Sequence, residues 1–309
     1  MAKRGPSKLN LLLAVDKPVG CTSHDVVGRV RRAVGERRVG HAGTLDPLAS
    51  GVMVIGIGQA TRLLGMLTLD TKNYIADISF GSETNTDDAE GQVTRSVEPS
   101  PELSDELFAR AELAKTVGPQ AQVPPAFSAI SVNGVRAYKS ARAGEQVELP
   151  ARDVEVYSAQ LISISEGQNG PVWTVAYSVS KGTYIRALAR DLGRAVGGAA
   201  HISQLRRTAS GSISLADALA VDDITVESAR VAQLDPVRVL GTNAVEVSDA
   251  AAADILCGRK LSPAAAPESV IGERLALING GELRALARRD DTCIAMTDVF
   301  PQGITGVRS

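Results

Sequence analysis

Apolar residues in the first eighty positions recur with the periods of short strands and one amphipathic helix. Residues 9–15 form a nearly continuous apolar run, which predicts a buried strand. After a turn at 16–20, the valines of residues 24–34 share one arc of a helix, and Thr22 and Ser23 offer hydroxyls to cap its start. The same rules predict a loop over 35–50, a strand over 51–57, a helix over 59–69 and a half-buried strand over 74–80.

The second half of the chain predicts a hairpin followed by a strongly patterned helix. Residues 154–165 and 172–180 alternate apolar and polar side chains across a Gly-rich link. In the next helix, Arg186, Arg190 and Arg194 follow one another at intervals of one helical turn beside an apolar stripe, which predicts a cationic ridge. Further helices are predicted at 103–117, around 138–144 and at 247–257.

The length of 309 residues suits two domains, and the character of the sequence changes near residue 240. We expect a disordered basic tail at 1–8 and a mixed α/β catalytic domain with a largely antiparallel sheet over 9–240. Residues 241–309 contain short strand-like runs, for example at 269–271, and predict a small β-rich domain.

The composition is that of a globular protein, with 44% hydrophobic and 22% charged residues. No run reaches the roughly 20 apolar residues that a membrane helix needs, and the start lacks the cleavage site of a signal peptide. The three cysteines and three histidines show no metal or disulfide spacing. These features predict a cytoplasmic protein without a structural metal.

The net charge of −2 conceals blocks of opposite sign. Residues 1–66 carry ten Lys/Arg against four Asp/Glu, and residues 181–207 carry six against one. Residues 83–106 are acidic, with one Arg against eight Asp/Glu. The basic blocks suit an RNA backbone if they share one face of the fold, and are solvated helix surfaces if they do not.

One carboxylate lies in the most distinctive loop of the chain. Residues 40–51 read Gly-His-Ala-Gly-Thr-Leu-Asp-Pro-Leu-Ala-Ser-Gly and place Asp46 between a basic helix and a buried strand. Loops held by rigid elements often carry catalytic groups, and Pro47 favours an extended backbone at Asp46. Because an Asp-Pro pair is more often only a turn, the residue types alone leave the role of Asp46 open.

Several segments together resemble the TruB family of tRNA pseudouridine synthases. The loop at 40–51 is similar to the family's signature loop, and Lys17-Pro18 with Gly20 and Ser23 is similar to its first motif. Further motifs follow in family order over about residues 9–210, namely Lys72-Asn73-Tyr74, then Thr84, Thr86, Asp88 and Gly91, then 123–129, 180–186, His201 and 205–208. Several motifs in the right order are far more specific than any one of them.

The resemblance implies a pseudouridine synthase fold with a PUA-like C-terminal domain, and an enzyme that isomerises the T-loop uridine of tRNA, the site conventionally called Ψ55. It carries the catalytic nucleophile onto Asp46. A carboxylate is ionised at neutral pH, and it can attack the sugar or the base, or remove a sugar proton, without a metal or cofactor. The sequence leaves these three routes open.

Two further catalytic residues follow from the resemblance. Arg186 is similar to the arginine that pairs with the catalytic aspartate, and a guanidinium would favour the charged carboxylate. The alternative for Arg186 is a phosphate contact or a surface charge. Tyr74 is similar to the tyrosine that stacks on the extruded uracil, and its alternative is a core tyrosine on the apolar side of its strand.

Four residues are placed near the substrate by the same resemblance. Tyr184 and Leu205 correspond to residues that line the uracil pocket, although Leu205 alone also suits simple core packing. His41 corresponds to the histidine that touches the RNA beside the target base. Asp88 is expected to support the active-site strand.

The expected partner is the T-arm of tRNA, gripped by the basic blocks at 29–38 and 181–207. Arg31, Arg32 and Arg206 are assigned to the RNA backbone. The other candidates are Arg29, Arg37, Arg38, Arg190 and Arg207. We expect no membrane contact, no obligate protein partner and a monomer.

Two other functions fit parts of the sequence. Gly56-Ile57-Gly58 resembles the start of a dinucleotide-binding fingerprint, but Thr61 replaces its third glycine and the acidic residue about 20 positions on is missing. A non-catalytic tRNA-binding or tRNA-folding protein on the same scaffold would also carry the basic blocks. The complete set of Asp46, Tyr74 and Arg186 favours the enzyme.

Overall fold

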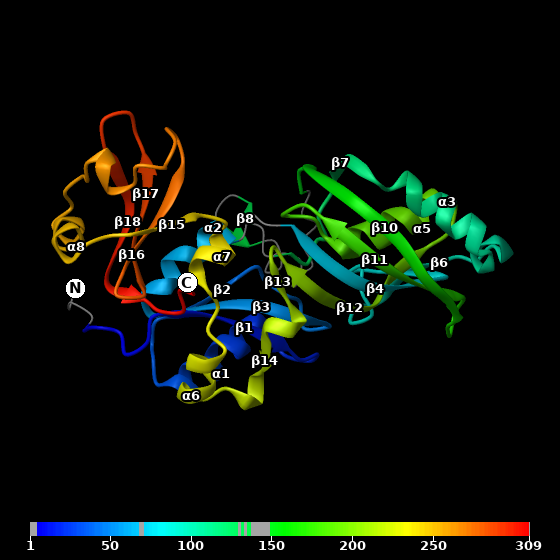
Figure 1. The fold of residues 1–309 in the computed structure, drawn as a ribbon. Coiled ribbons are helices and arrows are strands. Elements are labelled where there is room, and N and C mark those ends of the chain that lie inside the picture. The colour runs from blue at the N-terminus through cyan, green and yellow to red at the C-terminus, as the bar shows by residue number, and fades with distance from the viewer. Residues whose placement is uncertain (1–4, 68–70, 129–130, 133–134, 137–148, 309) are drawn as a thin grey trace. The chain divides into compact units, whose positions relative to one another are not determined.

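The computed structural model describes residues 5–67, 71–128, 131–132, 135–136 and 149–308 (Figure 1). They form two compact units, one from residues 5–46, 51–67 and 210–308 and the other from residues 47–50 and the described part of 71–209. The helix predicted around 138–144 lies outside the described residues. No helix among the described residues is long and apolar enough to span a membrane.

The sheet of the first unit is built on two strands that are buried except at Asp16 and Ser50. β1 (Leu11–Lys17) pairs antiparallel with β3 (Ala49–Ile57), which confirms both predicted strands. β2 (Val39–Ala42) pairs antiparallel with β3, and β14 (Ala218–Ala220) pairs parallel with β1. The prediction of a loop over all of 35–50 is therefore wrong at β2, because four residues are too few to show an apolar period.

Different elements pack on the two faces of this sheet. α1 (Ser23–Val34) begins at a capping box formed by Thr22 and Asp25 and packs its valines on Leu11, Leu13 and the facing residues of β3. α6 (Val226–Val231) contributes Ala229 to the same core. The opposite face, which carries Leu12 and Ala14, packs on α2 (Leu64–Leu67), α7 (Pro236–Leu240) and the C-terminal sheet. Alternate side chains of one strand thus enter two different cores.

The C-terminal residues form a four-stranded sheet that belongs to the first unit. Its order is β15-β16-β17-β18, with β15 parallel to β16 and the other pairs antiparallel. Phe300 and Ile304 share a core with Leu12, and Arg62 pairs with Asp298 while its guanidinium lies over the Phe300 ring. The bounds are β15 (Asn243–Glu246), α8 (Asp249–Leu256), β16 (Arg274–Asn279), β17 (Glu282–Arg289) and β18 (Ile294–Ile304).

This sheet confirms the predicted β-rich end, whereas its likeness to a PUA domain and the boundary at residue 240 stay predictions. The expected strand at 269–271 is wrong, since Val270 and Ile271 are exposed and unpaired with any described strand. At the other end, Ser7 N donates to Gln302 Oε1 and Lys8 N donates to Glu36 Oε2, so the prediction of a disordered tail over 1–8 is wrong at Ser7 and Lys8.

The second unit is a sheet with one apolar and one polar face. Its strand order is β12-β4-β11-β10-β7, and the pairs among β4, β11, β10 and β7 are antiparallel. Trp173 is buried on the apolar face against Phe80, while Asp77 and Thr174 hydrogen-bond each other on the polar face. The bounds are β4 (Lys72–Phe80), β7 (Gly118–Gln122), β10 (Arg152–Glu166), β11 (Pro171–Val179) and β12 (Ala200–Ser210).

Two longer helices accompany this sheet, and short elements complete both units. α3 (Glu106–Lys115) contacts β10, and α5 (Ile185–Ala195) contacts β4, as the apolar stripe of α5 predicts. The hairpin of β5 (Ser82–Thr84) and β6 (Val93–Ser96) lies in the acidic stretch, where no element is predicted. The remaining elements are β8 (Ser131–Val132), β9 (Val135–Arg136), β13 (Ile213–Ser214), and 3₁₀ turns at Gly58–Leu63, Pro101–Ser104, Leu215–Asp217, Val221–Asp223 and Pro263–Ala265.

Candidate active site

The loop that carries Asp46 is fixed from α1. Ser23 is 2% exposed, and its Oγ accepts a hydrogen bond from Leu45 N (2.8 Å) and donates one to Leu45 O (2.9 Å). Leu45 itself is buried, and Gly43 turns the loop with a φ of +79°. Thr22 rather than Ser23 caps the helix, so the Ser23 hydroxyl is used to hold the backbone next to Asp46, whose side chain is half-buried.

His41 belongs to the same unit as Asp46. It lies on β2, four residues before Leu45, and its ring meets the His24 ring of α1 edge-on, with centroids 5.8 Å apart. His41 is half-buried and His24 is exposed. The start of α1 therefore supports both His41 and the backbone before Asp46.

Arg186 lies in the first turn of α5 and is 4% exposed. Its Nη1 donates to Thr86 O (2.6 Å) and lies 3.4 Å from Asp88 Oδ2, and its Nη2 donates to Phe127 O (3.1 Å). The alternative of a surface charge is wrong, because this guanidinium is buried and held in a fixed orientation.

Asp88 is buried beside Arg186 in a tight turn. Its Oδ1 accepts from Thr86 Oγ1 (2.6 Å) and Glu90 N (3.1 Å), and Thr84 Oγ1 donates to Asp88 O (2.6 Å). Gly91 completes the turn, because a Cβ at this position would collide with Thr86 Oγ1. The polar motif at 84–91 thus provides a carbonyl and a carboxylate that contact the Arg186 guanidinium.

Tyr184 precedes α5 and is held by a residue that the sequence analysis does not single out. Gln122 is 2% exposed, its Oε1 accepts from Tyr184 N (2.8 Å), and its Nε2 donates to Tyr184 O (3.1 Å). This pair of bonds fixes the backbone two residues before Arg186. A glutamine next to Val123-Pro124-Pro125 gives no signal of this role in the sequence.

Tyr74 and Leu205 are both largely buried, on β4 and β12 of the second unit. Tyr177 lies directly opposite Tyr74 on β11, and burial raises the pKa of its hydroxyl far above the ordinary value. Its hydroxyl has no hydrogen-bond partner among the described residues. The alternation of β11 places Tyr177 on the apolar face, where the sequence suggests only core packing.

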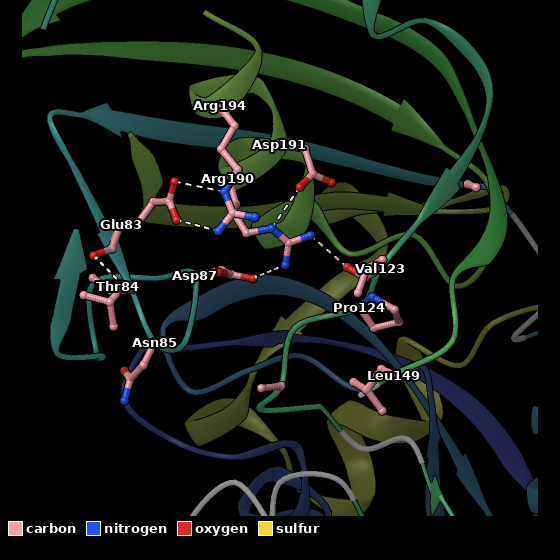
Figure 2. A pocket seen from close by; sticks show the side chains of 13 residues that line it. Glu83, Thr84, Asn85, Asp87, Val123, Pro124, Leu149, Arg190, Asp191 and Arg194 are labelled. Carbon is pink, nitrogen blue, oxygen red and sulfur yellow. Dashed lines mark hydrogen bonds and ion pairs between the residues drawn. The ribbon is translucent and has the colours of Figure 1, made fainter. Parts of the chain in front are cut away.

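The predicted arginine ridge of α5 is paired with carboxylates of the acidic stretch, with Arg186 and Arg190 buried and Arg194 about half exposed. The Arg190 Nη1 lies 2.8 Å from Asp87 Oδ2, its Nη2 donates to Val123 O, and its Nε donates to Asp191 (Figure 2). One turn on, Arg194 makes two hydrogen bonds to Glu83, which hold the pKa of that carboxyl below its ordinary value. A cavity of about 510 Å³ lies beside these pairs.

Two of the candidate RNA contacts are therefore wrong. Arg190 is buried in its ion pair, and the Arg207 side chain is buried in the second unit. The spacing of the arginines correctly predicts that they form one ridge on α5. Helix periodicity does not show, however, which segment of the chain packs on that ridge. Arg206 is half-buried and donates to Ser50 Oγ (3.2 Å).

The basic block of the first unit surrounds an open groove of about 870 Å³. Arg31 is exposed at the end of α1, and its Nη2 donates to Val39 O (2.8 Å), which directs the side chain towards β2. Arg32 is also exposed on α1. The charged residues that line the groove are Lys8, Arg31, Glu36, Arg37 and Arg38.

The site residues thus divide between the two units. Asp46, His41, Arg31 and Arg32 belong to the first, and the second holds Tyr74, Asp88, Tyr184, Arg186, Leu205 and Arg206. Among the described residues, no cluster of three or more His, Cys, Asp or Glu side chains is arranged to hold a metal ion.

Comparison with known proteins decides the family. The N-terminal domain of TruB family pseudouridylate synthases matches residues 31–185, and the C-terminal domain of tRNA pseudouridylate synthase B matches residues 186–237. The chain belongs to the TruB family. The relatives named tRNA pseudouridine synthase B include those of Mycobacterium sp. (strain KMS), 44% identical over 88% of this chain and 93% of that protein, and Cutibacterium acnes, 45% identical over 91% and 93%.

Solved structures confirm the fold expected for a TruB protein. A chain from an H/ACA ribonucleoprotein bound to a substrate RNA containing 2′-deoxyuridine matches with a TM-score of 0.67 at 22% identity, over 94% of this chain and 84% of that chain. A chain from the archaeal box H/ACA Nop10–Cbf5 complex matches with a TM-score of 0.65 at 23% identity, over 96% and 88%. The mixed α/β class predicted from the sequence is confirmed.

Proposed function

We propose that this chain is a tRNA pseudouridine synthase that isomerises the T-loop uridine at position 55. The observation that carries the proposal is the similarity of about nine-tenths of the chain to relatives with that name, at 44–45% identity. The reaction is an isomerisation, in which the N1–C1′ bond breaks, C5 bonds to C1′, C5 loses a proton and N1 gains one. No electrons are exchanged, so the chemistry requires no redox cofactor.

Asp46 is the proposed nucleophile. Its half-buried carboxylate follows a backbone that Ser23 holds by two hydrogen bonds, as expected for a group that must be positioned accurately. It acts by attack on the sugar, attack on the base or removal of a sugar proton. Arg186 is its proposed partner, as the resemblance to the family implies, and two carbonyls and Asp88 hold its buried guanidinium in one orientation.

The remaining site residues are proposed to receive the extruded uridine. Tyr74 stacks on the uracil, Tyr184 and Leu205 line its pocket, and His41 contacts the RNA beside it. The fixed backbone of Tyr184 supports this assignment, because stacking on side chains that are already positioned offsets part of the cost of unstacking the base.

The test of the function is to treat an unmodified tRNA transcript with the purified protein and map pseudouridine at each position. We expect one new pseudouridine, in the T-loop, without any added cofactor. A transcript with cytidine at the target position is the control. Tight tRNA binding without any new pseudouridine would instead support the non-catalytic alternative.

The basic groove of the first unit is proposed to hold the RNA backbone. Four cations line one open space there. Arg32 and Arg206 are proposed as separate contacts to the RNA backbone. Changing both Arg31 and Arg32 to Ala is expected to weaken tRNA binding and to lower the slope of log Kd against log salt by about two, at roughly one per lost phosphate contact. Binding is measured between low and physiological salt.

The matched control removes two positive charges outside the groove. Arg110, paired with Glu106 on α3, and Arg230 on α6 are both exposed. Changing these two to Ala is expected to leave the salt slope unchanged. Equal slopes for the Arg31/Arg32 variant and the original protein would mean that these two arginines are merely solvated.

A further inference from the structure

Asp87 has an unusual backbone conformation. Among the described residues it is the only one other than glycine with a positive φ, at +59°. This left-handed region is disfavoured for residues with a Cβ, although Asp tolerates it better than most. Such conformations persist where the surrounding structure imposes them.

This conformation lets two consecutive carboxylates face the same helix. In an extended strand, neighbouring side chains point to opposite sides. Here Asp88 Oδ2 lies 3.4 Å from Arg186 Nη1 and Asp87 Oδ2 lies 2.8 Å from Arg190 Nη1. Arg186 and Arg190 are one helical turn apart on α5. The loop at 86–88 therefore places its two carboxylates at the spacing of these two arginines.

The two arginines are held by the same two segments. Arg186 binds Thr86 O and Phe127 O, and Arg190 binds the Asp87 carboxylate and Val123 O. Figure 2 shows the Arg190 guanidinium between Asp87 and the Val123 carbonyl. The segment with Asp87 is also tied to β12, because Ile202 N donates to Asp87 O and Ala89 N donates to Ile202 O.

The pair is costly to keep buried. The side chains of Asp87 and Arg190 are each 10% exposed. Burial raises the pKa of the Asp87 carboxyl above its ordinary value, although the charges of Arg190, Arg186 and Arg194 oppose the rise. A buried ion pair is often no more stabilising than apolar residues of the same volume, so the pair is better explained by the geometry that it imposes.

We propose that Asp87 and Arg190 are positioning residues that hold the acceptors of Arg186 in place. Arg190 lies one turn after Arg186 on α5 and binds both the Asp87 carboxylate and Val123 O. It thereby fixes the distance between the 86–88 turn and the 123–127 segment, which provide the acceptors of the Arg186 guanidinium. The proposal rests on the role of Arg186 proposed above.

The test compares Arg190→Gln and Asp87→Asn with the original protein in single-turnover assays at saturating enzyme, well below the unfolding temperature. Rates are corrected for the folded fraction. We expect each variant to lose about tenfold to a hundredfold in rate, the cost typical of a misplaced catalytic group, with tRNA Kd changed less than about threefold. Asp87→Gly, which keeps the backbone conformation without the carboxylate, is expected to lose as much as Asp87→Asn.

Arg194→Gln is the matched control. Arg194 lies on the same ridge and pairs with Glu83, but it is two turns from Arg186 and its side chain is half exposed. It is expected to keep its rate within about threefold, because it binds neither acceptor segment of Arg186. The proposal would be overturned if both Arg190→Gln and Asp87→Asn kept the rate per folded molecule of the original protein. An equal loss in Arg194→Gln would also overturn it, because that loss would indicate a general effect on the fold.

A double variant separates this proposal from the proposed role of Arg186. If Arg190 acts through Arg186, then adding Arg190→Gln to Arg186→Lys is expected to lower the rate less than about threefold further. A full, independent loss in the double variant would overturn the positioning role and leave that of Arg186 intact. Near-normal turnover in Arg186→Lys alone would overturn the role of Arg186 itself.

Discussion

Replacing Asp46 by Asn is expected to abolish pseudouridine formation while leaving tRNA binding intact. The amide has nearly the shape of the carboxylate, so the half-buried side chain and the Ser23–Leu45 bonds that precede it should be retained. It has no negative charge and is a poor nucleophile and base. We expect a loss of at least about 10⁴-fold in the single-turnover rate, as for other enzymes that lose their nucleophile.

The measurement pairs the rate of pseudouridine formation with the Kd of tRNA, on the same preparations. Asp222→Asn is a suitable control, because that carboxylate is 90% exposed and its ion pair with Arg29 is a surface contact at 3.5 Å. It should be fully active. Unchanged turnover in the Asp46 variant would move the nucleophile to another residue, whereas a large rise in Kd would give Asp46 a role in binding.

Replacing Arg186 by Lys should lose most of the activity, although the charge is kept. A guanidinium donates from separate nitrogens to Thr86 O and Phe127 O while it faces Asp88, and a single ammonium cannot reproduce this planar arrangement. We expect the single-turnover rate to fall by about 10²-fold or more, through loss of orientation. Because the side chain is buried, the unfolding temperature should fall as well.

The rate is therefore compared with the folded fraction at each temperature. Arg110→Lys on the exposed face of α3 controls for the exchange itself and should change neither quantity. Near-normal turnover in folded Arg186→Lys would remove the proposed pairing with Asp46 and leave Arg186 a structural residue.

Much of the fold follows from apolar periodicity. The nearly continuous apolar run that predicts β1 reflects burial on both faces, since Leu11 and Leu12 enter different cores. The alternation in β4 and β11 marks a sheet with one apolar face, and the stripe of α5 marks its buried side. These signals are local, so they are visible without knowledge of what packs on them.

Other elements depend on the strands that pair with them. β2, β7 and β12 are strands because a neighbouring strand offers backbone hydrogen bonds, and β7 contains Gly118 and Pro119, which disfavour a strand. The same limit explains the error at Arg190. Its helix position is evident from the sequence, but its partner Asp87 lies over a hundred residues earlier.

The candidate site shows the same division. The resemblance to a family singles out Asp46, Tyr74 and Arg186, whose residue types suggest chemistry. Ser23 and Gln122 hold the backbone at Leu45 and Tyr184 through pairs of hydrogen bonds, and neither residue type signals this. Such supports become visible only when the donor and the acceptor are seen together.

The sharing of one core by β1, β3 and the C-terminal sheet affects how the nascent chain folds. Leu12, Val54 and Leu63 leave the ribosome more than two hundred residues before Leu283, Phe300 and Ile304, with which they share a core. Until the C-terminal sheet has formed, the apolar side chains of Leu12, Val54 and Leu63 lack the residues that pack on them in the folded protein. The strands of the second unit all lie between these two segments, so the second unit can form before the C-terminal strands of the first unit have been synthesised.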